Sequence, residues 1–151
     1  SSKYLESCAG SIFLINPFFK TKKDYIDKLI SVIQDDINTG IKKFTYEATK
    51  GGKFHKKNYS ILCKLLQSNF KPSKESLCFG LENLKKLKIE HSLINHSEKL
   101  HIIQSINDNV TDLDYFFNFE RQKINTYRLE GLAHYPFFDF EKIYDIIKQK
   151  I

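Results

Sequence analysis

The histidines are the first residues to consider for chemistry, because an imidazole can act as a general acid or base and as a metal ligand. The chain of 151 residues has five of them. His91, His96 and His101 recur at five-residue intervals, whereas side chains on one helix face are three or four residues apart. No set of His, Cys or carboxylate residues has the spacing of a zinc site. We therefore expect no metal site and no cofactor.

A second pattern involves Arg128 and His134, which are separated by five residues directly before an expected helix. This arrangement resembles the signature of the HEPN family of small helical ribonucleases. The resemblance covers about the last 25 residues, with Asp139 and Tyr144 roughly where that family has an acidic and an aromatic residue. It implies metal-independent RNA cleavage at a dimer cleft. Arg128 would hold the scissile phosphate, and His134 would act as acid or base.

Other catalytic motifs are missing from the sequence. It contains no GxSxG, CxxC, GxGxxG or kinase loop. Asp35 with Asp36, and Asp112 with Asp114, are interpreted as solvated or helix-capping acids rather than paired catalytic carboxylates. The leading interpretation is therefore a non-catalytic binding domain, and the ribonuclease is an alternative to it.

The positive charge is concentrated in the segment 41–64. This segment has seven lysines and one glutamate, which equals the whole net charge of +6. Aromatic residues alternate with these lysines, a mixture that suits contact with phosphates and bases or with a headgroup region. The candidate binding residues are Lys42, Lys43, Lys50, Lys53, Phe54, His55, Lys56 and Lys57.

The partner of this segment is expected to be a protein, with RNA or an anionic lipid such as a phosphoinositide as alternatives. A solvated lysine-rich loop would also explain the pattern. The chain has only two arginines, Arg121 and Arg128. Because Arg provides the bidentate fork that reads base edges, sequence-specific DNA binding is not expected.

Periodicity and composition predict an all-α fold. Apolar residues recur at helical spacing in most of the chain, and Gly and Pro are few. We expect a compact bundle of six or seven helices, with a short β-hairpin or an ordered loop at 41–57. Helices are expected at 4–13, 21–40, 59–70, 73–87, 97–106, 111–131 and 139–151, those at 59–70 and 73–87 as an antiparallel pair.

The predicted core contains apolar residues from five of these helices. They are Leu29, Ile33, Leu62, Leu66, Leu81, Phe117 and Ile147. The three cysteines, Cys8, Cys63 and Cys78, are expected to be buried free thiols in a reducing compartment.

Residues 1–151 are expected to form a single domain. Because the sequence has no Met, we expect a domain cut from a longer protein, with a processed chain as the alternative. No segment is apolar for long enough to span a membrane. The Lys, Ile, Asn and Phe richness is similar to that of effector domains which intracellular bacteria send into host cells. We therefore expect a cytoplasmic protein, located in the host cytoplasm if it is such an effector.

Overall fold

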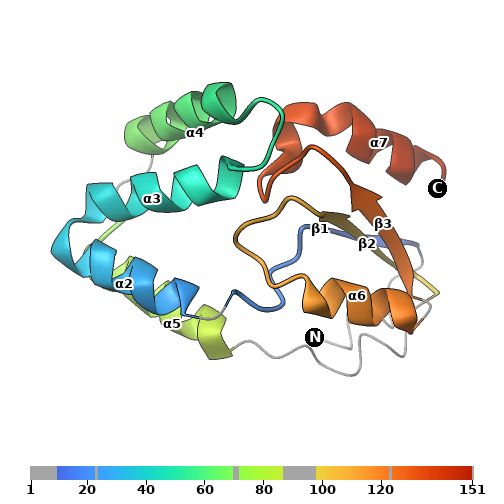
Figure 1. Ribbon diagram of the computed structural model, residues 1–151, viewed down its shortest axis with the longest axis horizontal. Helices are drawn as coiled ribbons and strands as arrows, with labels where there is room; N and C mark the ends of the chain where they lie inside the picture. Colours follow the sequence, from blue (N-terminus) through green and yellow to red (C-terminus); the bar gives the residue numbers. More distant parts are fainter. Residues whose placement is uncertain (1–9, 23, 70–71, 87–97, 123, 151) are drawn as a thin grey trace.

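The computed structural model describes residues 10–22, 24–69, 72–86, 98–122 and 124–150. Within these ranges it contains a three-stranded sheet and six α-helices (Figure 1). The strands are β1 (Ile12–Ile15), β2 (Leu100–Ser105) and β3 (Asn125–Leu129). The helices are α2 (Tyr25–Asp35), α3 (Ile37–Thr49), α4 (His55–Asn69), α5 (Lys74–Lys86), α6 (Asp114–Arg121) and α7 (Phe140–Lys148), the last preceded by a 3-10 turn, Pro136–Asp139.

The sheet is parallel, in the order β1-β2-β3. Ile12 is paired with Leu100 in the first ladder, and His101 with Asn125 in the second. All six residues of the central strand β2 are buried, as is typical of a parallel strand that is covered on both faces.

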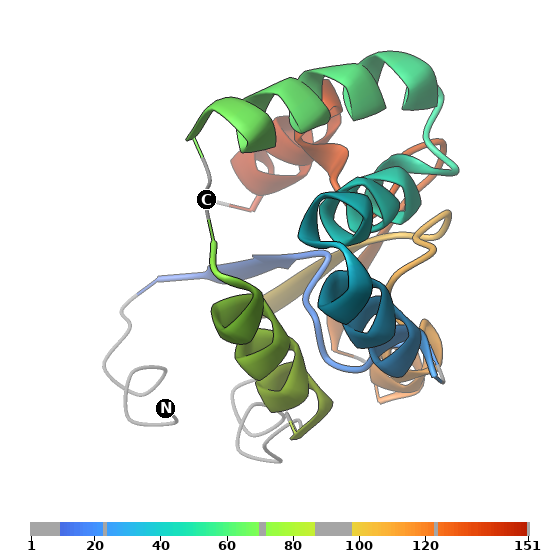
Figure 2. The same ribbon diagram turned by 90° about the vertical axis from the view of Figure 1, so that its left-hand side faces the viewer.

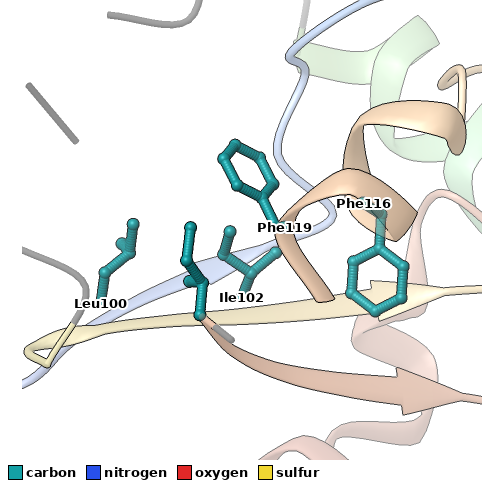
Figure 3. Close-up of a cluster of buried hydrophobic side chains, with 5 residues drawn as sticks. Leu100, Ile102, Phe116 and Phe119 are labelled. Atoms are coloured by element: carbon teal, nitrogen blue, oxygen red, sulfur yellow. The ribbon is translucent and has the colours of Figure 1, made fainter. Parts of the chain in front are cut away.

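One face of the sheet packs against α6. Leu100 and Ile102, two residues apart and so on the same face of β2, form a cluster with Phe116, Phe119 and Ile124 (Figure 3). The opposite face, which carries Ile103, packs against α7 through Ile143 and against Leu129 and Leu132. The sheet is therefore a layer between α6 and α7.

The four helices between β1 and β2 form a separate layer at the end of the sheet where the strands finish (Figures 1 and 2). α3 packs between α4 and α2, and α5 packs on α2. α2 and α3 are separated by Asp36, whose side chain caps α3 by accepting the N–H of Thr39 at 2.8 Å. Gly40 allows the two helices to approach closely, since a Cβ there would lie 2.2 Å from Cγ1 of Ile33.

The prediction of an all-α bundle is wrong, because the described residues include this parallel sheet. The helix predicted at 97–106 is strand β2, and the one predicted at 111–131 is helix α6 followed by strand β3. Part of the helix predicted at 4–13 is β1, and residues 1–9 lie outside the described ranges.

The predicted hairpin or loop at 41–57 is also wrong, because α3 continues to Thr49 and α4 begins at His55. The helices predicted at 59–70 and 73–87 correspond to α4 and α5, but α5 packs on α2 rather than on α4. Among the predicted core residues, Leu29, Ile33 and Leu62 are buried. The other four are half-buried: Leu66, Leu81, Phe117 and Ile147. None of the described helices is long and apolar enough to cross a membrane.

Candidate functional site

Three polar residues follow the three strands directly or within a few positions. Asn16 comes after β1, Asp108 after β2 and His134 after β3. In a parallel sheet all carboxyl ends lie at one edge, which is where such folds place their ligand sites. The structure joins the three residues in one hydrogen-bonded network at this edge, in which the Asn16 side chain bonds to the backbone of His134 and the His134 side chain bonds to Asp108.

Asp108 is the centre of this network, with a side chain that has no solvent exposure. Its Oδ1 accepts the backbone N–H groups of Val110 and Thr111 at 2.7 and 3.0 Å. Its Oδ2 accepts a hydrogen bond from Nε2 of Gln104 at 3.2 Å and lies 2.8 Å from Nδ1 of His134. Burial opposes ionisation, but the contacts with His134 and the two backbone N–H groups outweigh it and lower the pKa of Asp108. The carboxyl group is therefore held as a carboxylate.

This carboxylate determines which nitrogen of His134 has the proton. A carboxylate can only accept hydrogen bonds, so Nδ1 of His134 must donate. In the neutral imidazole Nε2 is then unprotonated and able to act as a base. Within the part of the chain that the structure describes, Nε2 has no hydrogen-bond partner. The His134 side chain is 15% exposed, and its ring centre lies 5.8 Å from that of Phe18, with the two rings nearly perpendicular.

Asn16 holds the loop that carries this histidine. Its Nδ2 donates to the carbonyl oxygens of Ala133 and His134 at 3.0 and 2.7 Å and to Oγ of Ser105 at 3.0 Å. Its Oδ1 accepts the backbone N–H of Ser105 at 2.7 Å. Asn16 is buried and has a left-handed backbone, with a φ of 44°, which Asn tolerates better than most residues. One side chain thus connects the end of β1 to the end of β2 and to the loop after β3.

A cavity of about 310 Å³ opens beside the histidine, between α2, α3 and α5. Of the twelve described residues that line it, two have polar side chains, Tyr25 and His134, and the others are aliphatic, Phe or Gly. The Tyr25 hydroxyl is buried and has no hydrogen-bond partner among the described residues. Burial, followed by the negative charges of Glu47 and Asp108, raises the pKa of Tyr25. The hydroxyl is therefore a protonated donor that is closed off from solvent.

Arg128 is not brought to His134. It lies on β3 and forms a two-point ion pair with Glu120, at 2.8 Å from Nε to Oε1 and 2.6 Å from Nη2 to Oε2. Its guanidinium also lies 5.5 Å from the ring centre of Phe117. The partner of His134 is Asp108 instead. Asp139 and Tyr144, the other two positions of the resemblance, are at the start of α7 and on an exposed part of it.

The lysine-rich segment forms the end of α3, the turn after it and the start of α4. The side chains of Lys42, Lys43, Lys56 and Lys57 are exposed. Lys50 lies 4.0 Å from Glu47 and contacts the ring of Tyr46, and Lys53 lies over the ring of Phe54. His55 packs edge-on against Tyr46, with Nδ1 3.2 Å from Oγ1 of Thr49. These candidate binding residues therefore lie on α3, on α4 and on the turn between them. The backbone N–H of Lys53 in this turn donates to the carbonyl oxygen of Gly131 at 2.8 Å, in the loop that carries His134.

The remaining candidate residues show no further site. His101 is buried in β2, stacks on Phe13 and has Nδ1 2.9 Å from the Tyr127 hydroxyl. His91, His96 and Cys8 lie outside the described residues. Cys63 and Cys78 are free and half-buried. The described residues contain no group of three or more His, Cys, Asp or Glu side chains that could hold a metal ion.

Sequence reasoning missed Asp108, Asn16 and Tyr25. A usable signal was nevertheless present, because Asp108 follows one short apolar run and His134 follows the next. The order Asp then His after two such strands is one that Ser-His-Asp enzymes use. The chain matches no protein-family model, and no curated protein matches it with significant sequence similarity.

Proposed function

We propose that this chain provides the histidine–aspartate part of the active site of a hydrolase that works through a serine or cysteine nucleophile. The observation that carries the proposal is the 2.8 Å contact between Nδ1 of His134 and the fully buried carboxylate of Asp108. Both residues lie at the carboxyl edge of adjacent parallel strands. Their order along the chain, Asp before His, is that of α/β-hydrolase triads, in which the nucleophile comes first.

The roles of the two residues follow from the geometry. Nε2 of His134 takes the proton from the nucleophile as that group attacks an acyl carbon, and returns it to the departing alcohol or amine. Asp108 keeps the proton of the neutral ring on Nδ1 and stabilises the imidazolium that forms in the transition state. A water molecule then repeats the cycle on the acyl intermediate, with His134 again as base.

A merely structural ion pair explains the site less well. Burying a carboxylate is costly unless it is paired and hydrogen-bonded. The Asp108 carboxylate has four such partners, two side chains and two backbone N–H groups. Yet the other nitrogen of its histidine partner bonds to none of the described residues, and the ring faces a cavity. One nitrogen fixed by a carboxylate and one left for a ligand is the arrangement that a general base needs.

The proposal requires a nucleophile from outside the described ranges, because no Ser or Cys within them bonds to Nε2 of His134. The test therefore uses the protein expressed from its complete natural gene. A fluorophosphonate probe should label one residue covalently, and mass spectrometry of the peptides should identify it. His134→Ala should abolish both the labelling and the hydrolysis of p-nitrophenyl esters. A protein that neither reacts with the probe nor cleaves any ester would overturn the proposal.

The earlier predictions for the lysine-rich segment remain predictions. The solvent exposure of the lysines on α3 and α4 would let them contact a protein partner or an anionic surface. Reversal of Lys53, Lys56 and Lys57 to Glu should abolish binding to anionic vesicles if the partner is a lipid. The ribonuclease based on Arg128 and His134, the effector role and the cytoplasmic location also stay predictions.

A further inference from the structure

Gln104 continues a row of buried apolar residues on the central strand. Leu100, Ile102 and Gln104 alternate along β2, so their side chains leave the same face of the sheet. The first two pack in the cluster with α6 (Figure 3), and Gln104 is as deeply buried, with 1% exposed. An amide is costly to bury unless its hydrogen-bonding groups find partners. A glutamine at this position is therefore explained by its polar partners rather than by packing.

The Gln104 side chain is held in one orientation by two acceptors. Its Nε2 donates to Oδ2 of Asp108 and to the backbone carbonyl oxygen of Ser105, each at 3.2 Å. A carboxylate oxygen and a carbonyl oxygen can only accept, so the NH₂ end of the amide must face them. The Ser105 carbonyl oxygen is fixed in the turn after β2, because it also accepts the backbone N–H of Asp108 at 3.2 Å. The amide is thus in place independently of His134.

The hydrogen bonds of Asp108 leave His134 a single acceptor site. A carboxylate has about four such sites, two on each oxygen. Both sites of Oδ1 are taken by the backbone N–H groups of Val110 and Thr111. Among the described residues Gln104 takes one of the two sites on Oδ2, and Nδ1 of His134 takes the other at 2.8 Å. The Thr111 hydroxyl also lies 3.3 Å from Nδ1, but a hydrogen bond to an ionised group is the stronger one.

We propose that Gln104 is a positioning residue for His134, which fills one acceptor site of the Asp108 carboxylate so that the imidazole can bond to Oδ2 in one orientation. Without this amide both sites on Oδ2 would be open to the ring. The inference rests on the function proposed above, since the orientation of His134 affects a rate only if its Nε2 acts as the base. Gln104 acts through Asp108 and is not itself a catalytic residue.

The experiment observes the His134 ring without requiring catalysis. The protein expressed from its complete natural gene is labelled with ¹⁵N-histidine. NMR then reports which ring nitrogen has the proton and how fast the Nδ1 proton exchanges with water. The spectrum of His134→Ala identifies the signals of this residue by their loss. In the wild type the proton should be on Nδ1 and should exchange slowly.

Gln104→Met keeps the length of the side chain but removes the donor. The proton should stay on Nδ1, because the Asp108 carboxylate is still its acceptor. Its exchange with water should become roughly threefold to tenfold faster, which is the effect of one net hydrogen bond. The kcat for hydrolysis of p-nitrophenyl esters should fall by a similar factor, with KM unchanged. If Gln104→Met does not fold, Gln104→Leu serves the same purpose.

Ile102→Val is the matched control. It changes a buried side chain on the same face of the same strand and leaves the hydrogen bonds of Asp108 intact. It should lower the urea midpoint and leave both the exchange of the Nδ1 proton and kcat unchanged. If it changed them as much as Gln104→Met does, loss of packing rather than loss of a donor would be the cause, and the proposal would be overturned.

The outcomes separate this inference from the proposed function. Faster proton exchange in Gln104→Met, in a protein that cleaves no ester, would keep the positioning of the ring and remove the hydrolase. Ester cleavage that depends on His134, with proton exchange and kcat unchanged in Gln104→Met, would keep the hydrolase and overturn the role of Gln104.

Discussion

Two sets of ionisable residues in this molecule differ in how far water reaches them. Asp108 has a fully buried side chain, and that of His134 is 15% exposed. Arg128, by contrast, is 57% exposed in its pair with Glu120, and most lysines of 41–64 are open to solvent. The exposed residues account for the net positive charge that is visible in the sequence. The buried set has the geometry of a site.

The difference has a physical cause. Water screens exposed charges, so a surface ion pair contributes little and can be rearranged. A buried charge must be satisfied by neighbours in fixed positions, and these neighbours in turn fix its orientation. Asp108 therefore determines the tautomer of His134, whereas Glu120 determines little beyond the position of one guanidinium. Four predictions test this comparison, beginning with the largest expected effect.

The first prediction concerns the carboxylate itself. In Asp108→Asn the amide can donate to Nδ1 of His134, which would leave the proton on Nε2 and remove the base. We expect kcat for ester hydrolysis to fall by about 10⁴-fold with little change in KM. Asp112→Asn, which changes a more exposed carboxylate of the same loop, is the control and should retain most of the activity. A loss in Asp108→Asn no larger than in the control would contradict the role given to Asp108.

The second prediction concerns Asn16, which positions the histidine loop. Asn16→Ala leaves the N–H of Ser105 and the carbonyl groups of Ala133 and His134 without this partner. We expect a loss of about 2–4 kcal/mol in the free energy of unfolding, measured by urea denaturation, and about 10²-fold in kcat.

Asn16→Gly serves as the matched variant. It loses the same hydrogen bonds but accepts the positive φ of 44° more readily than Ala does. It should therefore be the more stable of the two, by on the order of 1 kcal/mol. Equal stability of both variants and the wild type would show that the network contributes nothing to folding.

Hydrophobic spacing predicted part of this fold correctly. The apolar stripe Ile26, Leu29, Ile30 and Ile33 lies on a true helix, α2, and the helices α4, α5 and α7 were also predicted near their actual positions. Each of these segments has polar residues on a solvent-facing side, so the 3.6-residue period is visible. Three of the four helices of the helical layer, α2, α4 and α5, were therefore readable from the sequence, whereas most of α3 fell in the segment 41–57 that was predicted as a hairpin or loop.

The sheet was not readable, for a reason specific to its central strand. In β2 both faces are buried, so the strand shows no alternation of apolar and polar residues. Leu100 and Ile103, with Ile106 after them, happen to repeat at a helical interval, which favoured the wrong assignment. Short apolar runs of this kind do not distinguish a buried strand from a helix by period alone.

The candidate site was half predicted. His134 was singled out, but with Arg128, its neighbour in sequence, rather than with Asp108, 26 residues away. Asp108 and His134 are far apart in the sequence, and they become neighbours only because β2 and β3, which precede them, lie side by side in the sheet. Tyr25 and the cavity could not be predicted, because they depend on how α2, α3 and α5 pack.

The third prediction uses the lowered pKa of Asp108. Because this pKa lies below its ordinary value of 3.8 in the folded protein, the unfolded chain binds more protons than the native state as the pH falls below about 4. The stabilisation from Asp108 is thus complete above that pH and is lost as the pH falls through the native pKa.

The measurement is the urea midpoint as a function of pH. Asp108→Asn should flatten the acid side of this curve, because it removes the group whose proton uptake differs between the two states. Glu141→Gln, which removes an exposed carboxylate on α7, is the control and should leave the steepness unchanged. If the urea midpoint of Asp108→Asn and that of Glu141→Gln fell equally steeply with pH, the buried carboxylate would not differ from an exposed one, and the prediction would be wrong.

The fourth prediction concerns Arg128, whose substitution should have the smallest effect on stability and activity. A large effect there would contradict the contrast between the buried and the exposed residues. The Arg128 guanidinium is paired with Glu120 in solvent, so Arg128→Ala should leave the melting temperature and the rate of ester hydrolysis nearly unchanged, within about a factor of two in rate. The ribonuclease interpretation requires the opposite, because Arg128 would hold the scissile phosphate and its loss would abolish RNA cleavage. Measuring both activities in Arg128→Ala and His134→Ala therefore separates the two. If His134→Ala loses ester hydrolysis and Arg128→Ala keeps it, the result supports the pairing of His134 with Asp108. If both variants lose RNA cleavage, the two side chains act on one RNA substrate although the fold holds them apart, and the ribonuclease interpretation is supported.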